Sequence, residues 1–184
     1  MTEVTFVSTN PGKFREVRAL LAPFGVHTVW RRRVLPEPQA DTLEEVVLAK
    51  LAAVRDISGY VLVEDSGLFI PSLKGFPGVY SAHFLKTWRF APILELLEHR
   101  SRRAYFCTVA GLQRGNRRWT SVGEVRGRIA EHPRGRRGFG YDPIFIPENE
   151  TRTFGEIPPE EKNANSHRAR AVRQVGELLQ SRHR

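Results

Sequence analysis

The first 30 residues constrain the fold most, because a β-rich run, a turn and an amphipathic helix lead into a second β-rich run. Residues 4–8 form the first run, and the turn signal Asn10-Pro11-Gly12 follows it directly. Residues 26–30 form the second run. Between the turn and the second run, apolar residues recur at helical spacing, at Phe14, Val17, Leu20 and Leu21. This strand–helix–strand order is typical of the start of an α/β fold.

The rest of the chain continues the alternation of helices and strands. Residues 114–117 join two long β-rich runs and have Gly115 and Asn116 where a hairpin turn needs positive φ. Together with the opening pattern, this hairpin predicts an α/β fold with a mixed sheet, in a single domain over residues 1–184, with frayed residues at 181–184. The other elements expected are helices at 43–57, at 93–97 and after Ser166, and strands at 60–63, 104–112, 119–129 and 144–146.

Composition excludes several classes of protein. Hydrophobic residues make up 40% of the 184 residues and aromatic residues 10%, which excludes a disordered chain. No apolar run approaches the length of a membrane span and no segment resembles a secretory leader, so we expect a cytosolic protein with no membrane partner. The single cysteine, Cys107, excludes an internal disulfide, and no Cys/His set has zinc-finger spacing.

The net charge of +9 suggests an anionic partner, which is either nucleic acid or a phosphorylated small molecule. The arginines are spread over several clusters, which favours solvated faces, and the chain has no helix-turn-helix, RNP or KH signature. We therefore expect no stable nucleic-acid partner, and a basic nucleic-acid-binding module is the alternative. Only five of the 29 basic residues are lysines. Four of these lie in segments that other patterns single out, where a compact ammonium group is useful: Lys13, Lys50, Lys74 and Lys162.

The first candidate site is the turn after the first strand. Its small polar residues, glycine and lysine precede a helix N-terminus, where backbone N–H groups and the helix dipole favour a phosphate. It is not a Walker loop, because its glycine and hydroxyl positions do not match that motif. An ordinary β–α turn is the alternative. The segment comprises Ser8, Thr9, Asn10, Pro11, Gly12 and Lys13.

The second candidate site is Glu64-Asp65-Ser66-Gly67-Leu68, directly after a buried strand. Two adjacent carboxylates at the carboxyl end of a strand suit a hard divalent cation or a general base. Successive strand residues point to opposite faces, so only one of the two carboxylates can face a given cleft. A Gly- and Pro-rich loop is expected from there to Gly78. A solvated acidic turn is the alternative.

The third segment is Gly138-Phe139-Gly140-Tyr141-Asp142-Pro143. Two glycines around a phenylalanine leave its face accessible, and an aspartate accepts hydrogen bonds, so the loop could stack on and read a purine base. A turn whose aromatic ring fills the core is the alternative.

The fourth segment runs from Glu161 to Arg168. Ser166 is placed to cap the last helix, which puts His167 and Arg168 in its first turn. A cation is unfavourable beside the positive end of the helix dipole. Such a broken local rule is typical of a functional site. A plain N-cap is the simpler interpretation of Ser166.

In this order, the four segments resemble those of the inosine triphosphate pyrophosphatase (HAM1-like) family, from Val4 to about Val172. The resemblance implies an elongated mixed β-sheet with flanking helices, two lobes around a central cleft, and a homodimer. The patterns that carry it are Ser-x-Asn-x-Gly-Lys, Glu-Asp-Ser-Gly-Leu with Gly-x-Pro-Gly-x-Tyr-Ser, Phe-Gly-Tyr-Asp-Pro and Glu-Lys-Asn-x-x-Ser-His-Arg.

The resemblance also implies a role for each matched residue. Asp65 binds Mg²⁺, for which Mn²⁺ can substitute, and acts as the general base, while Glu37 is a second metal ligand. Because an aspartate bound tightly to a metal is a poor base, the alternative is that Glu64 shares one of these two roles. Residues 8–13 and Lys50 hold the triphosphate, and Phe139 stacks on the base. The implied substrate-binding residues are Ser8, Thr9, Asn10, Pro11, Gly12, Lys13, Lys50, Ser66, Phe139, Gly140, Tyr141, Asp142, Lys162, His167 and Arg168.

The implied activity is hydrolysis of non-standard purine nucleoside triphosphates (ITP, dITP and XTP) to the monophosphate and pyrophosphate, which cleanses the nucleotide pool. Water attacks the α-phosphorus, and the bound metal neutralises the developing charge. Arg168 only donates hydrogen bonds, so it suits a 6-oxo purine and not the 6-amino group of adenine. A related pyrophosphatase acting on modified pyrimidine or methylated nucleotides is the alternative enzyme.

Overall fold

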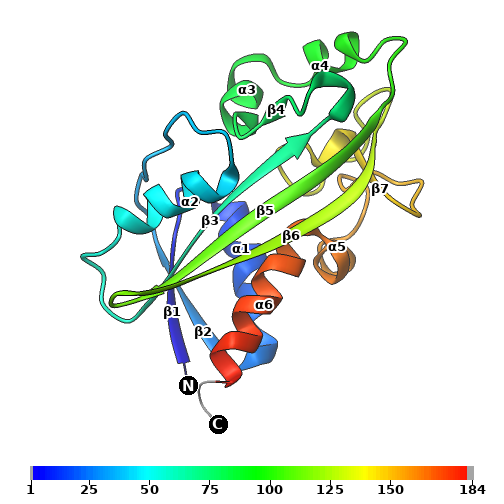
Figure 1. The fold of residues 1–184 in the computed structure, drawn as a ribbon. Coiled ribbons are helices and arrows are strands. Elements are labelled where there is room, and N and C mark those ends of the chain that lie inside the picture. Colours follow the sequence, from blue (N-terminus) through cyan, green and yellow to red (C-terminus); the bar gives the residue numbers. More distant parts are fainter. Residues whose placement is uncertain (1, 182–184) are drawn as a thin grey trace. The chain divides into compact units, whose positions relative to one another are not determined.

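The structure is a computed structural model, and it describes residues 2–181. Within that range the strands form one seven-stranded sheet in the order β2-β1-β3-β5-β6-β7, with β4 paired to β3 (Figure 1). β2 and β3 run parallel to β1, whereas β4 is antiparallel to β3 and β7 to β6, so the sheet is mixed as predicted. The strands are β1 (Thr2–Val7), β2 (Val26–Arg31), β3 (Tyr60–Phe69), β4 (Pro77–Gly78), β5 (Arg103–Arg114), β6 (Arg117–Ile129) and β7 (Phe145–Pro147).

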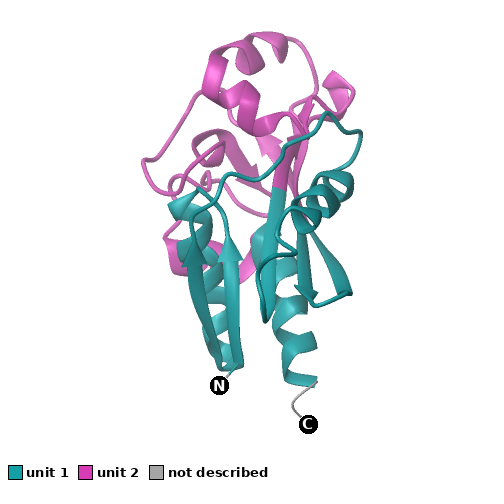
Figure 2. Ribbon diagram, turned by 90° about the vertical axis from the view of Figure 1, so that its left-hand side faces the viewer, with its two compact units in different colours: residues 1–65, 108–123, 167–184 teal, residues 66–107, 124–166 magenta. Residues whose placement is uncertain are grey.

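The chain divides into two compact units, which Figure 2 distinguishes by colour. Unit 1 comprises residues 1–65, 108–123 and 167–184, and unit 2 comprises residues 66–107 and 124–166. The boundaries fall inside β3, β5 and β6, so each of these strands contributes to both units. The frayed end expected at 181–184 is not observed at Ser181, which ends the last helix, and residues 182–184 lie outside the described part of the chain.

Unit 1 contains three α-helices within its described residues: α1 (Pro11–Leu21), α2 (Leu43–Ala52) and α6 (His167–Ser181). The periodic apolar face of α1 packs with that of α6 and with the buried side chains of β1 and β3 in one core. Gly123 on β6 makes this packing possible, because a Cβ there would collide with the carbonyl of His167 and the backbone of Ala171. The close approach fixes the first turn of α6 against the sheet.

Unit 2 has a second core, built around aromatic side chains. Phe106 and Phe145 meet edge-on with ring centroids 4.7 Å apart, and Leu68 and Ile70 of the β3 end pack into the same core. Its helices, among the described residues, are α3 (Ser81–Trp88), α4 (Ala91–Leu96) and α5 (Pro159–Asn165). No helix within residues 2–181 has the length and apolar content that crossing a membrane requires.

Several expected boundaries were wrong, each for a physical reason. The loop expected from residue 64 is instead the second half of β3, because Leu68 is buried in the core of unit 2. Gly67 in this stretch serves close packing, since a Cβ would collide with the carbonyl oxygen of Gly78 on β4. Helix α2 ends at Ala52 and not at residue 57, although Val54 beyond it is still buried in a turn.

Three further differences concern local structure. Helices α3 and α5 were not predicted, since both are short and flanked by Pro or Gly-rich segments. The hairpin between β5 and β6 is present, but only Gly115 has positive φ there, so the expectation for Asn116 was wrong. Strand β4 was not predicted either, because it lies in the expected loop, whereas the remaining helices and strands lie where the periodicity predicts them, within a few residues at each end.

Candidate active site

The turn before α1 is held in shape by its own polar side chains. Asn10 caps the helix, because its Oδ1 accepts hydrogen bonds from the backbone N–H groups of Gly12 (2.8 Å) and Lys13 (3.1 Å). Ser8 Oγ accepts a third bond, from the N–H of Asn10 at 3.1 Å. The turn is anchored from outside by Trp30, whose Nε1 donates to the carbonyl of Ser8 at 2.8 Å. The predicted phosphate turn is therefore a preorganised loop at a helix N-terminus, with Lys13 in the first turn.

Glu64 connects this turn to the last helix. Its Oε1 lies 2.5 Å from Nζ of Lys13, and its Oε2 accepts hydrogen bonds from Nε (3.3 Å) and Nη2 (3.2 Å) of Arg168. Arg168 Nη1 lies 2.5 Å from Oε2 of Glu16 on α1. Glu64, Arg168 and Glu16 are all buried. The unfavourable position of Arg168 near the start of α6 is thus offset by two carboxylates, which is why a cation is stable there.

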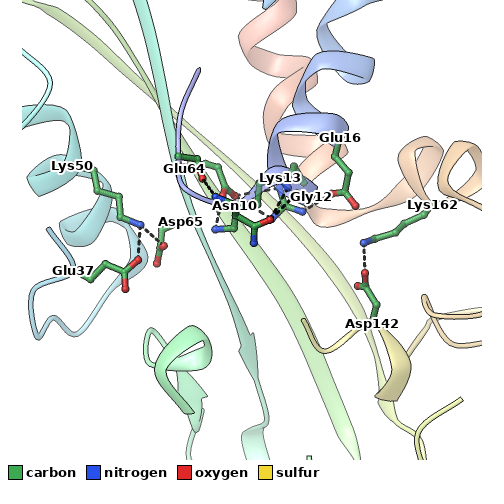
Figure 3. Close-up of polar contacts among 12 residues, drawn as sticks. Asn10, Gly12, Lys13, Glu16, Glu37, Lys50, Glu64, Asp65, Asp142 and Lys162 are labelled. Atoms are coloured by element: carbon green, nitrogen blue, oxygen red, sulfur yellow. Dashed lines mark hydrogen bonds and ion pairs between the residues drawn. The ribbon is translucent and has the colours of Figure 1, made fainter. Parts of the chain in front are cut away.

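Asp65, the next residue of β3, has different partners from Glu64. Its Oδ1 lies 2.6 Å from Nζ of Lys50, a buried lysine in the last turn of α2. The same ammonium lies 3.4 Å from Oε1 of Glu37 (Figure 3). The divergence of Glu64 and Asp65 confirms the expectation that neighbouring strand residues face opposite sides. One carboxylate belongs to the Lys13–Arg168 network and the other to Lys50.

The charges around Lys50 shift its pKa. Burial by itself lowers the pKa of a lysine, but the charge of Asp65, its hydrogen bond to the ammonium, and the charges of Glu37 and Glu64 outweigh that effect. The pKa of Lys50 is therefore raised above its ordinary value, and the group is a cation at neutral pH.

Glu37 and Asp65 suit Mg²⁺, which takes part of its coordination from phosphate and water, better than they suit a metal coordinated by protein side chains alone. Both are carboxylates that converge on one cation, the ammonium of Lys50. Within the described residues, no three His, Cys, Asp or Glu side chains are grouped so that they could hold a metal. Mg²⁺ is commonly bound by one or two carboxylates together with phosphate oxygens and water. These two residues could hold such an ion once a phosphate completes its coordination.

The predicted base-reading residues of unit 2 form a second cluster. Asp142 and Lys162 are both buried, and Oδ2 of Asp142 lies 2.6 Å from Nζ of Lys162 (Figure 3). The same oxygen accepts a hydrogen bond from the N–H of Phe139 at 2.8 Å. The Lys162 ammonium also lies 5.1 Å from the ring centroid of Phe139, which is partly exposed. Gly138 has positive φ, and a Cβ there would collide with the Asp142 carboxylate.

The other predicted residues differ from one another in burial and in their contacts. Tyr141 is buried, and its hydroxyl donates to the carbonyl of Ser81 at 2.9 Å, which orients the side chain toward the core of unit 2. Ser66 is partly exposed on β3, and Gly140 is partly exposed in the loop beside Phe139. Thr9 and Pro11 are exposed in the phosphate turn, while His167 is buried as the first residue of α6, directly after Ser166.

The predicted residues thus fall into two groups, one in each unit. The group of unit 1 consists of two separate clusters, which are Lys13 with Glu64 and Arg168 and Lys50 with Glu37 and Asp65, and the group of unit 2 contains Phe139, Asp142 and Lys162. Sequence reasoning missed Glu16, which binds Arg168 from α1. A signal was present, because Glu16 is a charged residue next to Val17 on the apolar face of an amphipathic helix.

Residues 4–178 match the Ham1 family. This chain belongs to the Ham1 family. The match covers nearly all of the chain, so it includes both groups of candidate residues and confirms the family resemblance expected from the four segments.

Named relatives of this Ham1 chain include two archaeal proteins described as dITP/XTP pyrophosphatase. The protein of Thermococcus kodakarensis is 48% identical over 96% of both chains, and that of Pyrococcus horikoshii is 45% identical over the same shares. Among solved structures, a HAM1 protein from Coxiella burnetii superposes with a TM-score of 0.84 and 31% identity, covering 98% of this chain and all of its own. The Ham1 protein of Staphylococcus aureus gives a TM-score of 0.83 and 28% identity over similar shares. These likenesses confirm the predicted α/β fold with a mixed sheet.

Proposed function

We propose that this Ham1 chain is a dITP/XTP pyrophosphatase, which hydrolyses dITP, XTP and ITP to the nucleoside monophosphate and pyrophosphate. The observation that carries the proposal is the 48% identity, over 96% of both chains, to a relative described by that activity. An enzyme of this kind removes non-standard purine nucleotides before they enter DNA or RNA. The alternatives of a nucleic-acid-binding module and of a pyrimidine or methylated-nucleotide pyrophosphatase have no comparable support.

The residues of unit 1 are assigned to the phosphates and the metal. Lys13 offers an ammonium to the triphosphate at the N-terminus of α1, where the helix dipole favours an anion, and Lys50 offers a second ammonium. Glu37 and Asp65 are proposed to hold Mg²⁺, or Mn²⁺ in its place. When bound, the metal supplies charge neutralisation for the phosphate oxygens.

Asp65 is proposed as the general base. It accepts the proton of a water molecule as the water oxygen bonds to the α-phosphorus, and the bond to the leaving pyrophosphate breaks. The contacts of Glu64 favour Asp65 for this role, because both oxygens of Glu64 lie against Lys13 and Arg168. The adjacent carboxylate, Asp65, touches only Lys50 among the ion pairs of the described residues.

The family resemblance is the ground for assigning Phe139, Asp142, Lys162, His167 and Arg168 to the base. Phe139 is partly exposed and is proposed to stack on the purine. Arg168 donates only, so an oxygen at position 6 is favoured over an amino group. An unpaired buried donor costs about 1–3 kcal/mol, which corresponds to selectivity of roughly 5- to 150-fold per contact. Ser66, Gly140 and Tyr141 are proposed as further substrate-binding residues on the ground of the family resemblance.

The decisive test of the activity is product analysis with a substrate panel. Purified protein with Mg²⁺ is incubated with dITP, XTP, ITP, ATP and GTP, and the products are separated by ion-exchange chromatography. We expect pyrophosphate and monophosphate from the first three substrates and much slower turnover of ATP and GTP. Stepwise release of orthophosphate, or equal rates with all five substrates, would overturn the proposal.

The role of Asp65 is tested by Asp65→Asn, which keeps the shape of the side chain. Loss of a positioned general base and metal ligand lowers kcat by a factor of about 10²–10⁴. Asp41→Asn, which alters an exposed aspartate of the same unit, is the matched control and should keep full activity. Circular dichroism of both variants checks the fold. Wild-type kcat in a folded Asp65→Asn variant contradicts the assignment.

The proposal also includes a homodimer and a cytosolic location, which rest on the family resemblance and on the composition. Light scattering on the purified full chain tests the dimer directly, with a mass near twice 21.0 kDa as the expected result.

A further inference from the structure

Lys50 lies where the proposed metal ion should lie. Its ammonium is 2.6 Å from Asp65 Oδ1 and 3.4 Å from Glu37 Oε1, so it bridges the two carboxylates assigned to the metal (Figure 3). The side chains of Lys50 and Asp65 are only 6% and 12% exposed, whereas that of Glu37 is 63% exposed. The Lys50 ammonium therefore lies between the two carboxylates on their buried side, whereas Glu37 is open to solvent.

A divalent ion and this ammonium compete for the same oxygens. With Lys50 present, the two carboxylates and the lysine have a net charge of −1, and a divalent ion would bring the group to +1. Without the lysine, the two carboxylates would match a divalent ion exactly in charge. Unneutralised positive charge in a poorly hydrated site is unfavourable, and it is relieved when an anion arrives.

We propose that Lys50 occupies the cation position of the Glu37–Asp65 pair in the nucleotide-free protein, so that divalent metal binds tightly only together with nucleotide. The inference rests on the proposed function. The phosphates give the Lys50 ammonium a new anionic partner, and the carboxylates it leaves become ligands for the metal. Lys50 thereby couples metal binding to substrate binding, and it acts as a positioning residue for both.

The side chain and its helix suit such an exchange. A lysine carries its charge on a flexible four-carbon stem, so the ammonium can change partners without movement of the backbone. Lys50 lies in the last turn of α2, where the helix dipole favours a cation at any position near the helix end. Arg168, in contrast, is bound by two carboxylates at three nitrogen atoms and has no comparable freedom.

The test measures metal binding and not turnover. Mn²⁺ is titrated into nucleotide-free wild-type protein and into Lys50→Gln, and free Mn²⁺ is followed by its electron paramagnetic resonance signal. We expect Lys50→Gln to bind Mn²⁺ at least about tenfold more tightly, since it loses one positive charge at the metal position. Lys86→Gln, which removes an exposed lysine of α3, is the matched control and should bind like wild type.

A second titration measures the coupling itself. Each protein is titrated with Mn²⁺ in the presence of a non-hydrolysable dITP analogue, and the gain in Mn²⁺ affinity that the analogue causes is compared. The gain should be large in wild type and smaller, by about tenfold or more, in Lys50→Gln. Lys50→Arg keeps the charge and should exclude Mn²⁺ from the nucleotide-free protein as wild type does, so it separates the effect of charge from any effect on folding.

The outcomes distinguish this inference from the proposed function. If wild type hydrolyses dITP but Lys50→Gln and wild type bind Mn²⁺ equally, the inference is wrong and the function stands. Tight Mn²⁺ binding by nucleotide-free wild type would also show that the inference is wrong, and it would leave the proposed function intact. If wild type neither hydrolyses dITP nor gains Mn²⁺ affinity with the analogue, the proposed function fails as well. Should Lys50→Gln not fold, the wild-type and Lys50→Arg titrations still decide the matter.

Discussion

Arg168 offers the sharpest test of how charge is balanced inside unit 1. It is 1% exposed and lies between Glu16 and Glu64, two buried carboxylates from α1 and β3. The substitution Arg168→Met keeps most of the volume and the straight side chain but removes the charge. Glu64 keeps Lys13 as a partner, whereas Glu16 loses its ion pair with Arg168.

The magnitude follows from the loss of this buried ion pair. Breaking a buried ion pair by removing one partner costs about 3–5 kcal/mol, because the other charge stays buried without its counterion. That is a large share of the roughly 5–15 kcal/mol by which a domain is stable. With a urea m-value of about 2 kcal/mol per M, the midpoint of unfolding should fall by about 2 M.

Urea unfolding followed by tryptophan fluorescence is the appropriate assay. Trp30 and Trp119 belong to unit 1, so their emission reports the part of the chain that contains Arg168. Arg173→Met alters an exposed arginine of the same helix and should change the free energy of unfolding by less than about 0.5 kcal/mol. A similar loss in both variants would show that helix propensity, and not the buried charges, sets the effect.

The charge argument is tested most directly by a double-mutant cycle. Glu16→Gln removes the carboxylate whose ion pair Arg168→Met breaks, so the double variant should recover about 1–3 kcal/mol relative to Arg168→Met alone. Strict additivity of the two single losses is the result that refutes the reasoning, because it means that the two side chains do not compensate one another.

Two further predictions concern single side chains. Burial raises the pKa of the Cys107 thiol to about 11, so its reaction with a disulfide reagent should be slow at pH 8 and should rise about tenfold per pH unit toward pH 11; a rate at pH 8 equal to that of free cysteine contradicts this. Trp30→Phe keeps the stack on Phe14 (ring centroids 5.0 Å apart) but loses the hydrogen bond to Ser8, worth about 0.5–1.5 kcal/mol, so KM for dITP should rise roughly 2- to 10-fold with little change in kcat. An unchanged KM means that the phosphate turn does not depend on Trp30.

Local periodicity was enough to predict most of the elements. The first strand, α1 and β2 were found because the turn signal at residues 10–12 separates two β-rich runs and the helix has a regular apolar face. The second half of β3 was missed because Ser66 and Gly67 are typical of a loop. A glycine is needed at position 67 because the backbone of Gly78 on the neighbouring strand β4 lies too close for a Cβ atom. No local sequence pattern contains that contact.

The candidate site was predictable in its residue types but not in its pairings. Strand alternation correctly separates Glu64 from Asp65, because it is a property of two neighbours. The partners of these carboxylates come from α1, α2 and α6, at separations of 51, 15 and 104 residues for Lys13, Lys50 and Arg168. Glu16 was missed for the same reason, since its partner is 152 residues away.

The scarcity of lysine in an arginine-rich chain acquires a physical meaning from these pairings. All five lysines lie within the described residues, and three of them (Lys13, Lys50 and Lys162) each lie 2.5–2.6 Å from a buried carboxylate. Lys74, also singled out by the sequence, is exposed and makes no such pair within the described residues. A guanidinium is suited to a fixed bridge between two carboxylates, which is the position of Arg168, whereas an ammonium holds one partner and can exchange it. Under the proposed function, Lys13 and Lys50 of unit 1 exchange their internal carboxylate partners for the triphosphate, which an ammonium can do, whereas Arg168 keeps its fixed position.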